Sequence, residues 1–174
     1  MSGAYHGTFL ILESANKLAT MGHDVIFCAE SVMSTVPPQE IVQESKDVFE
    51  KAATKEVSPF SGLVELRKRI ATRFDRLYSQ KVDWKNQIVV TSGSLEGEYH
   101  AMGALLNPGD EVIMTAPGFF FDIPAKILGA KPIFYQLRAE NNYYHDASEI
   151  EKLITKKSKM IVVCSPHNPT GRVS

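Results

Sequence analysis

Four short apolar segments in the second half of the chain constrain its fold more than any other feature. They comprise residues 88–90, 111–115, 132–137 and 160–163, and helical patterns separate them. None shows the alternation of apolar and polar residues that a half-exposed strand requires. Strands of this kind are buried on both faces, which is typical of a parallel sheet covered by helices. We therefore predict an α/β fold, with a mainly parallel sheet and helices on both of its faces.

The helices are predicted from apolar spacing and from start and stop signals. Two helices precede the sheet, one ending near Gly22 and one starting after Pro37-Pro38. A third opens at Gly62, where apolar residues recur at intervals of three and four: Leu63, Leu66, Ile70, Phe74 and Leu77. Between the strands we expect helices over about 95–106 and 120–128. A last helix starts at the capping box formed by Asp146 and Glu149.

Composition excludes several functional classes. Nineteen basic and twenty acidic residues give a net charge of −1, so there is no basic field for nucleic acid. No apolar run approaches the ~20 residues that span a bilayer. The two cysteines form no disulfide framework, and no His or Cys spacing fits zinc. We expect a cytoplasmic protein with no metal and with neither nucleic acid nor a membrane as partner.

Ligands of parallel sheets gather at the carboxyl ends of the strands, which directs attention to three loops. In the first, residues 91–97, small residues lead from a strand into a helix, whose free N–H groups favour an anion such as phosphate. The alternative is a plain turn capped by Ser92 or Ser94. In the second, residues 116–122, one of three successive aromatics either stacks on a flat ligand or packs against helices.

The third loop, residues 165–171, holds one amide side chain, Asn168, between two prolines. A fixed asparagine can donate a hydrogen bond to a phenolic or carbonyl oxygen. The alternative is a turn closed by an Asx-type bond. His167 alone is weak evidence for metal binding or base catalysis, because no second ligand accompanies it.

Together these residues resemble the class I/II aminotransferases of fold type I, which use pyridoxal 5'-phosphate. The most specific match is Asn168-Pro169-Thr170-Gly171 after an apolar strand, the family's N-P-T-G signature. The order of three earlier motifs also matches the family: Gly62, then Thr91-Ser92-Gly93-Ser94, then Asn107-Pro108-Gly109-Asp110. The resemblance covers residues from about Asp24 to Ser174.

The resemblance implies roles for five residues. Gly93 would make the phosphate turn, and Ser94 and Leu95 would offer backbone N–H groups to the cofactor phosphate. Phe119 would stack on the pyridine ring, and Asn168 would hydrogen-bond its 3'-oxygen. It also implies two parts: residues 1–61 contribute to a small domain and substrate loop, and residues 62–174 form the front of the cofactor-binding domain.

The chain also departs from the family pattern. Residues 28–33 lack a glycine that the family often has there, Val57 replaces a common tyrosine, and the run 95–98 is unusual. No catalytic residue is identified, because the family's Schiff-base lysine follows the N-P-T-G motif and would lie beyond Ser174. Lys159 is rejected as a substitute, since it stands at the start of a strand, away from the carboxyl edge.

The implied activity is transfer of an amino group between an amino acid and a 2-oxo acid, by a homodimer when full length. We expect this 174-residue chain alone to be inactive. A lyase or cyclase on the same scaffold is an alternative, because the front half does not separate these chemistries. A truncated, non-catalytic protein that pairs with a complete subunit is another.

Overall fold

The computed structural model describes residues 4–28, 35–51 and 57–174. All of the glycine-lacking segment 28–33 except Cys28 lies outside these residues. Contacts divide the chain into two units, Met1–Val57 and Ser58–Ser174. This division falls close to the predicted boundary after residue 61, while the roles assigned to the two parts stay predictions.

The first unit contains two helices, α1 (Ala4–Thr20) and α2 (Gln39–Glu50). α2 starts directly after Pro38, as the double proline predicts. These helices confirm the helical segment expected ahead of the sheet. Among the residues that the structure describes, no helix is long and apolar enough to cross a membrane.

The second unit contains a three-stranded parallel sheet. Its strands are β1 (Glu111–Ala116), β2 (Lys131–Gln136) and β3 (Ser158–Ile161), in the order β2-β1-β3. β1 pairs in parallel with both neighbours, with Ile113 opposite Ile133 on one side and Ile161 on the other. Parallel pairing places the carboxyl ends of all three strands at one edge of the sheet.

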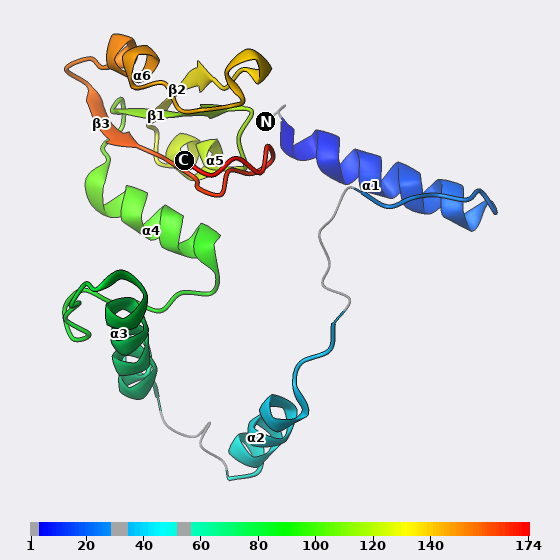
Figure 1. The fold of residues 1–174 in the computed structure, drawn as a ribbon, viewed down its shortest axis with the longest axis vertical. Coiled ribbons are helices and arrows are strands. Elements are labelled where there is room, and N and C mark those ends of the chain that lie inside the picture. Colours follow the sequence, from blue (N-terminus) through cyan, green and yellow to red (C-terminus); the bar gives the residue numbers. More distant parts are fainter. Residues whose placement is uncertain (1–3, 29–34, 52–56) are drawn as a thin grey trace. The chain divides into compact units, whose positions relative to one another are not determined.

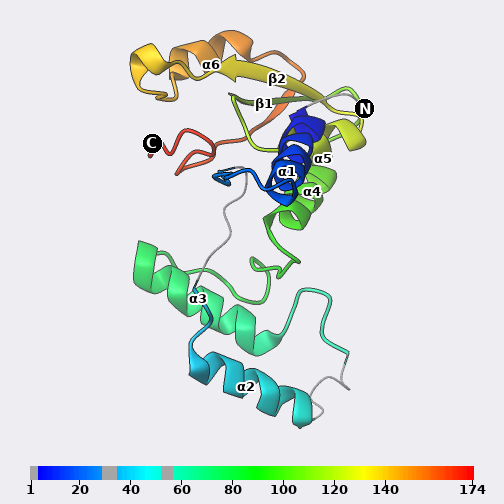
Figure 2. The same cartoon turned by 90° about the vertical axis from the view of Figure 1, so that its right-hand side faces the viewer.

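Helices cover both faces of this sheet, which confirms the predicted α/β class (Figures 1 and 2). On one face, α4 (Ser94–Leu105) and α5 (Asp122–Ile127) pack against Val112 and Met114 of β1. On the other face, α6 (Ala147–Leu153) packs near Ile113 and Tyr135. Successive side chains of β1 therefore enter opposite cores, which explains its unbroken apolar sequence.

Two predicted strands differ from the structure. Residues 88–90 form no strand, because they find no ladder partner among the described residues; Val90 makes a single backbone bond, to the Ser61 carbonyl. The last strand begins at Ser158 rather than at residue 160. The length of β3 is set by its pairing with β1. The last backbone bond between the two strands runs from Val162 N to Ile113 O, at 2.9 Å.

Two predicted helices start later than expected. α3 (Val64–Tyr78) begins two residues after Gly62, and α5 begins at Asp122 rather than residue 120. Phe120 has φ of 48°, which an α-helix does not contain. The short 3-10 segment η2 (Ala139–Asn141) follows β2. α6 begins where the capping signal predicts, and the Asp146 side chain accepts from Ser148 N at 2.9 Å. The reciprocal half of the capping box is not observed, because the Glu149 carboxylate accepts from Lys152 Nζ.

Candidate functional site

The first loop leads into an uncapped helix. Gly93 is the residue ahead of α4, with φ of 85°, and no side chain caps the helix. Capping by Ser92 or Ser94 is therefore not observed. The N–H groups of Ser94 and Leu95 open the helix and have no partner among the described residues, so they can hold an anion.

Open space surrounds this turn. No atom lies within 4 Å of the position that a side chain at Gly93 would occupy, and Ser94 and Leu95 are both exposed. The positive φ at Gly93 favours glycine, because a side chain is strained there. The turn can thus bring backbone N–H groups close to a ligand.

Glu96 brings negative charge to the same turn. Its carboxylate accepts from Ser92 N and lies 3.4 Å from His100 Nε2. The Ser92 N–H, and then the His100 side chain, hold the pKa of Glu96 below its usual value. Burial raises the pKa of nearby Glu98. The unusual run 95–98 therefore places an ionised carboxylate beside the anion-binding turn.

The second loop places its three aromatic side chains in two environments. Phe119 is 41% exposed, and its ring lies 4.2 Å from that of Phe120. Phe121 instead packs against the core beneath α4 and α5. One aromatic thus serves packing and another, Phe119, presents a ring at the carboxyl edge, where it can stack on a planar ligand.

The third loop is closed by backbone bonds rather than by its asparagine. His167 N donates to Arg172 O, and Gly171 N donates to His167 O, both at 2.7 Å. Asn168 is exposed, and its side chain has no hydrogen-bond partner in the described part of the chain. The Asx-type closure is therefore not formed, and the Asn168 amide is free to meet a ligand.

A buried histidine connects the second and third loops. His167 is 2% exposed; its Nε2 lies 3.1 Å from Thr115 Oγ1 and its Nδ1 lies 2.9 Å from Thr170 Oγ1. Burial, followed by the neighbouring His145, lowers the pKa of His167, while the Pro117 carbonyl acts in the opposite direction. Sequence reasoning gave this residue little weight, because no second His, Cys or carboxylate accompanies it. Its partner Thr115 lies 52 positions earlier, a contact that no local pattern reveals.

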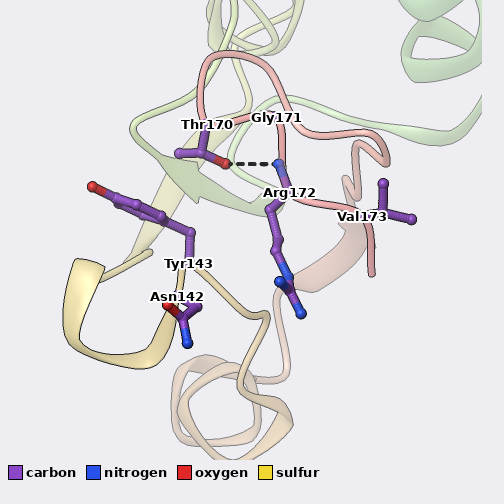
Figure 3. A pocket seen from close by; sticks show the side chains of 6 residues that line it. All are labelled: Asn142, Tyr143, Thr170, Gly171, Arg172 and Val173. Atoms are coloured by element: carbon purple, nitrogen blue, oxygen red, sulfur yellow. Dashed lines mark hydrogen bonds between the residues drawn. The ribbon is translucent and has the colours of Figure 1, made fainter.

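A shallow pocket of about 470 Å³ adjoins the third loop (Figure 3). Asn142 and Tyr143, from the segment after β2, line one part, and Thr170, Gly171, Arg172 and Val173 line the rest. The Arg172 guanidinium lies over the Tyr144 ring at 3.3 Å. No group of three His, Cys, Asp or Glu suited to a metal ion occurs within residues 4–28, 35–51 and 57–174.

Comparison with known proteins identifies the family. Residues 24–174 match the family described as aminotransferase class I and II. The chain belongs to this family. The match confirms the resemblance carried by the N-P-T-G signature and by the order of the upstream motifs.

Individual aminotransferases are similar over nearly the whole chain. Aspartate aminotransferase of Pyrococcus horikoshii is 33% identical over 162 residues, which are 92% of this chain and 40% of that protein. Probable aspartate/prephenate aminotransferase of Rhizobium leguminosarum is 34% identical over 166 residues, 94% of this chain and 41% of that protein. A solved mutant of Thermus thermophilus aspartate aminotransferase has a TM-score of 0.90 and 25% identity, covering 99% of this chain and 44% of that one. The chain thus spans about 40% of the length of the first of these relatives.

The five residues predicted as cofactor contacts lie in the three loops, and their roles stay predictions. Gly93, Ser94 and Leu95 surround the start of α4, Phe119 follows β1, and Asn168 follows β3. α4 runs back along β1, so its N-terminus lies toward the carboxyl edge (Figure 1). Lys159 is the second residue of β3, at the opposite end of the strand from this edge.

Proposed function

We propose that this chain forms part of the pyridoxal 5'-phosphate site of an aminotransferase. Three features at one edge support the fit: free N–H groups at an uncapped helix, an exposed aromatic ring and an exposed amide. The N–H groups suit the cofactor's phosphate, the aromatic ring suits its planar ring, and the amide suits its ring oxygen. The uncapped start of α4 is the observation that carries the proposal, because helix N-termini favour phosphate.

Each residue then has one task. The N–H groups of Ser94 and Leu95 hold the phosphate and fix the ligand's position. Phe119 covers one face of the ring and excludes water, and Asn168 donates to the 3'-oxygen and favours its ionised form. When bound, pyridoxal phosphate supplies an electron sink for the amino acid's α-carbon, and the protein supplies orientation and electrostatics.

We further propose that the active enzyme is longer than this chain. The chain spans about 40% of the length of an aspartate aminotransferase that it resembles, and its own lysines match no family position for the covalent link. The complete protein would transfer an amino group between an amino acid and a 2-oxo acid, as a homodimer. Without the linking lysine, this chain alone would not catalyse that reaction.

We infer a cytoplasmic location, and the free thiols of Cys28 and Cys164 agree with a reducing compartment. Cell fractionation with an antibody to this chain tests the location. Recovery in a membrane or secreted fraction would contradict it.

Borohydride trapping tests the proposed function. The 174-residue chain and the complete reading frame are each incubated with pyridoxal phosphate, reduced with borohydride and digested for mass spectrometry. We expect one stoichiometric adduct in the complete protein, on a lysine outside this chain, and only scattered, substoichiometric labelling within it. A stoichiometric adduct on one of the chain's thirteen lysines, with transaminase turnover, would overturn the proposal that the chain is inactive alone.

A further inference from the structure

The buried His167 ring connects the end of β1 to the third loop and lies beside Pro117 of the second loop. On one side it meets Thr115, near the end of β1, at 3.1 Å. On the other it meets Thr170, within its own loop, at 2.9 Å. Buried polar groups are expensive unless they are hydrogen-bonded, so these two bonds favour a single arrangement of the ring.

The hydrogen-bond network favours one placement of the ring proton. Arg172 N donates to Thr170 Oγ1 at 3.4 Å, which Figure 3 marks with a dashed line. The Thr170 hydroxyl, already an acceptor, can then donate its own hydrogen to His167 Nδ1. A neutral ring that accepts at Nδ1 carries its proton on Nε2 and donates it to Thr115 Oγ1.

Thr115 in turn lies against Gly118, in the loop that holds Phe119. An added side chain at Gly118 would lie 2.6 Å from the Thr115 carbonyl oxygen and 3.3 Å from its Oγ1, so the loop runs close against Thr115. The Pro117 carbonyl lies close enough to His167 to act on its pKa. Movement of the His167 ring would therefore shift Pro117 and Gly118, the two residues that precede Phe119.

The surroundings of the ring are nearly uncharged. The titratable group that faces His167 is His145, edge-on, with ring centres 6.0 Å apart and planes at 84°. Behind it, Tyr135 Oη of β2 lies 2.6 Å from His145 Nδ1. The other contacts come from hydroxyl and carbonyl groups, and Arg172 contributes only its backbone. No carboxylate among these groups stabilises an imidazolium, so burial favours the neutral ring.

We propose that His167 is a positioning residue, a neutral imidazole protonated on Nε2 that holds the Asn168 loop in register with the Phe119 loop. The proposal rests on the proposed function, since Asn168 and Phe119 are its predicted ligand contacts. His167 does not touch the ligand. It acts through its neighbour Asn168, whose amide must stay aimed at the ligand oxygen.

The test uses the complete protein and 4'-deoxypyridoxine 5'-phosphate, which lacks the aldehyde and so binds without a covalent link. Absorbance titration gives its dissociation constant and the pH at which its bound 3-hydroxyl ionises. In H167F, which removes both ring bonds, we expect the dissociation constant to rise about tenfold. The ionisation of the bound hydroxyl should move up by about one pH unit, because Asn168 no longer favours the ionised oxygen.

Two further variants keep the result interpretable. H167Q retains a donor near the Nε2 position and should restore at least half of both effects, and T170V should give smaller changes in the same direction if H167F fails to fold. His23→Phe, at an exposed histidine of the other unit, is the matched control. Long-range 1H–15N spectra of the five histidines should show His167 neutral with its proton on Nε2.

Three other outcomes would each contradict a different part of the proposal. Unchanged binding in H167F, or weaker binding with unchanged hydroxyl ionisation, would overturn the positioning role. A proton on Nδ1 would overturn the assigned tautomer, because Nε2 would then accept from Thr115 Oγ1 instead of donating to it. A wild-type protein that does not bind the probe would overturn the proposed function itself, and positioning would then have no ligand to serve.

Discussion

Glu96 is the residue at the edge whose charge opposes the predicted ligand. It occupies the first turn of α4, accepts from Ser92 N and is held ionised by that bond and by His100. Its carboxylate partly neutralises the positive end of the helix that would attract a phosphate. The sequence shows only an acidic residue in the first turn of a helix. The structure shows that its carboxylate bonds to Ser92 N and so lies at the turn that would bind the phosphate.

Glu96→Gln removes the charge and keeps an oxygen that can accept from Ser92 N. We expect the complete protein to bind 4'-deoxypyridoxine 5'-phosphate about two- to fourfold more tightly, because a like charge near the phosphate is lost. Isothermal titration at low salt measures the change, and the gain should shrink as salt screens the charge. E65Q, at an exposed glutamate in the first turn of α3, is the control. Equal affinity of E96Q and wild type would contradict the expected repulsion.

At the scale of elements, α6 depends on Asp146, the residue that precedes and caps it. Asp146 Oδ1 accepts from Ser148 N at 2.9 Å and Ser148 Oγ at 2.7 Å. The helix then packs Ile150 and Leu153 against the core beside β2. Since α6 covers one face of the sheet, a weaker cap should lower the stability of the sheet itself.

Asp146→Ala should lower the Tm of the folded chain by about 2–4 °C. The bonds from Ser148 hold the pKa of Asp146 below its usual value, so the folded state favours the ionised form. The stability from this group is therefore fully present above the ordinary pKa of aspartate and is lost as pH falls through the lower folded value. D146N, which keeps a capping oxygen, should retain most of the Tm but lose this pH dependence. Thermal denaturation between pH 2 and 7 would contradict the argument if D146A matched wild type throughout.

At the scale of the second unit, both outer strands of the sheet leave an edge unpaired among the described residues. On β3, Ile161 is 46% exposed, and Val163, two residues further on, is 58% exposed. Exposed apolar strand edges pair readily with other chains. We therefore expect the 174-residue chain to associate in solution.

Ile161→Lys should reduce this association, because a charged edge residue opposes pairing between strands. Light scattering at several protein concentrations measures it, with the variant giving at least a twofold lower apparent mass than wild type. The control is I26K, at a residue that is 86% exposed in the other unit. A wild-type chain that stays a monodisperse monomer with a cooperative thermal transition would contradict the expectation.

Strand and helix types were predictable where local patterns suffice. The apolar runs at 111–115 and 132–137 became β1 and β2 within a residue at each end, and Asp146 capped α6 as expected. Residues 88–90 failed as a strand because a strand exists only with a ladder partner, which no local pattern supplies. α5 is shorter than predicted because Phe120 has a left-handed backbone. This was not predictable, because no glycine or asparagine marks the position.

The sequence by itself determined the fold class, the family and the loops in which Gly93, Ser94, Leu95, Phe119 and Asn168 lie, because motifs and apolar periodicity are local properties. The tertiary structure decided which polar groups meet. It left the start of α4 uncapped, freed the Asn168 side chain and joined His167 to Thr115 across 52 positions. This contact forms because the parallel strands β1 and β3 bring their carboxyl ends to one edge of the sheet. Burial there favours the neutral form of His167.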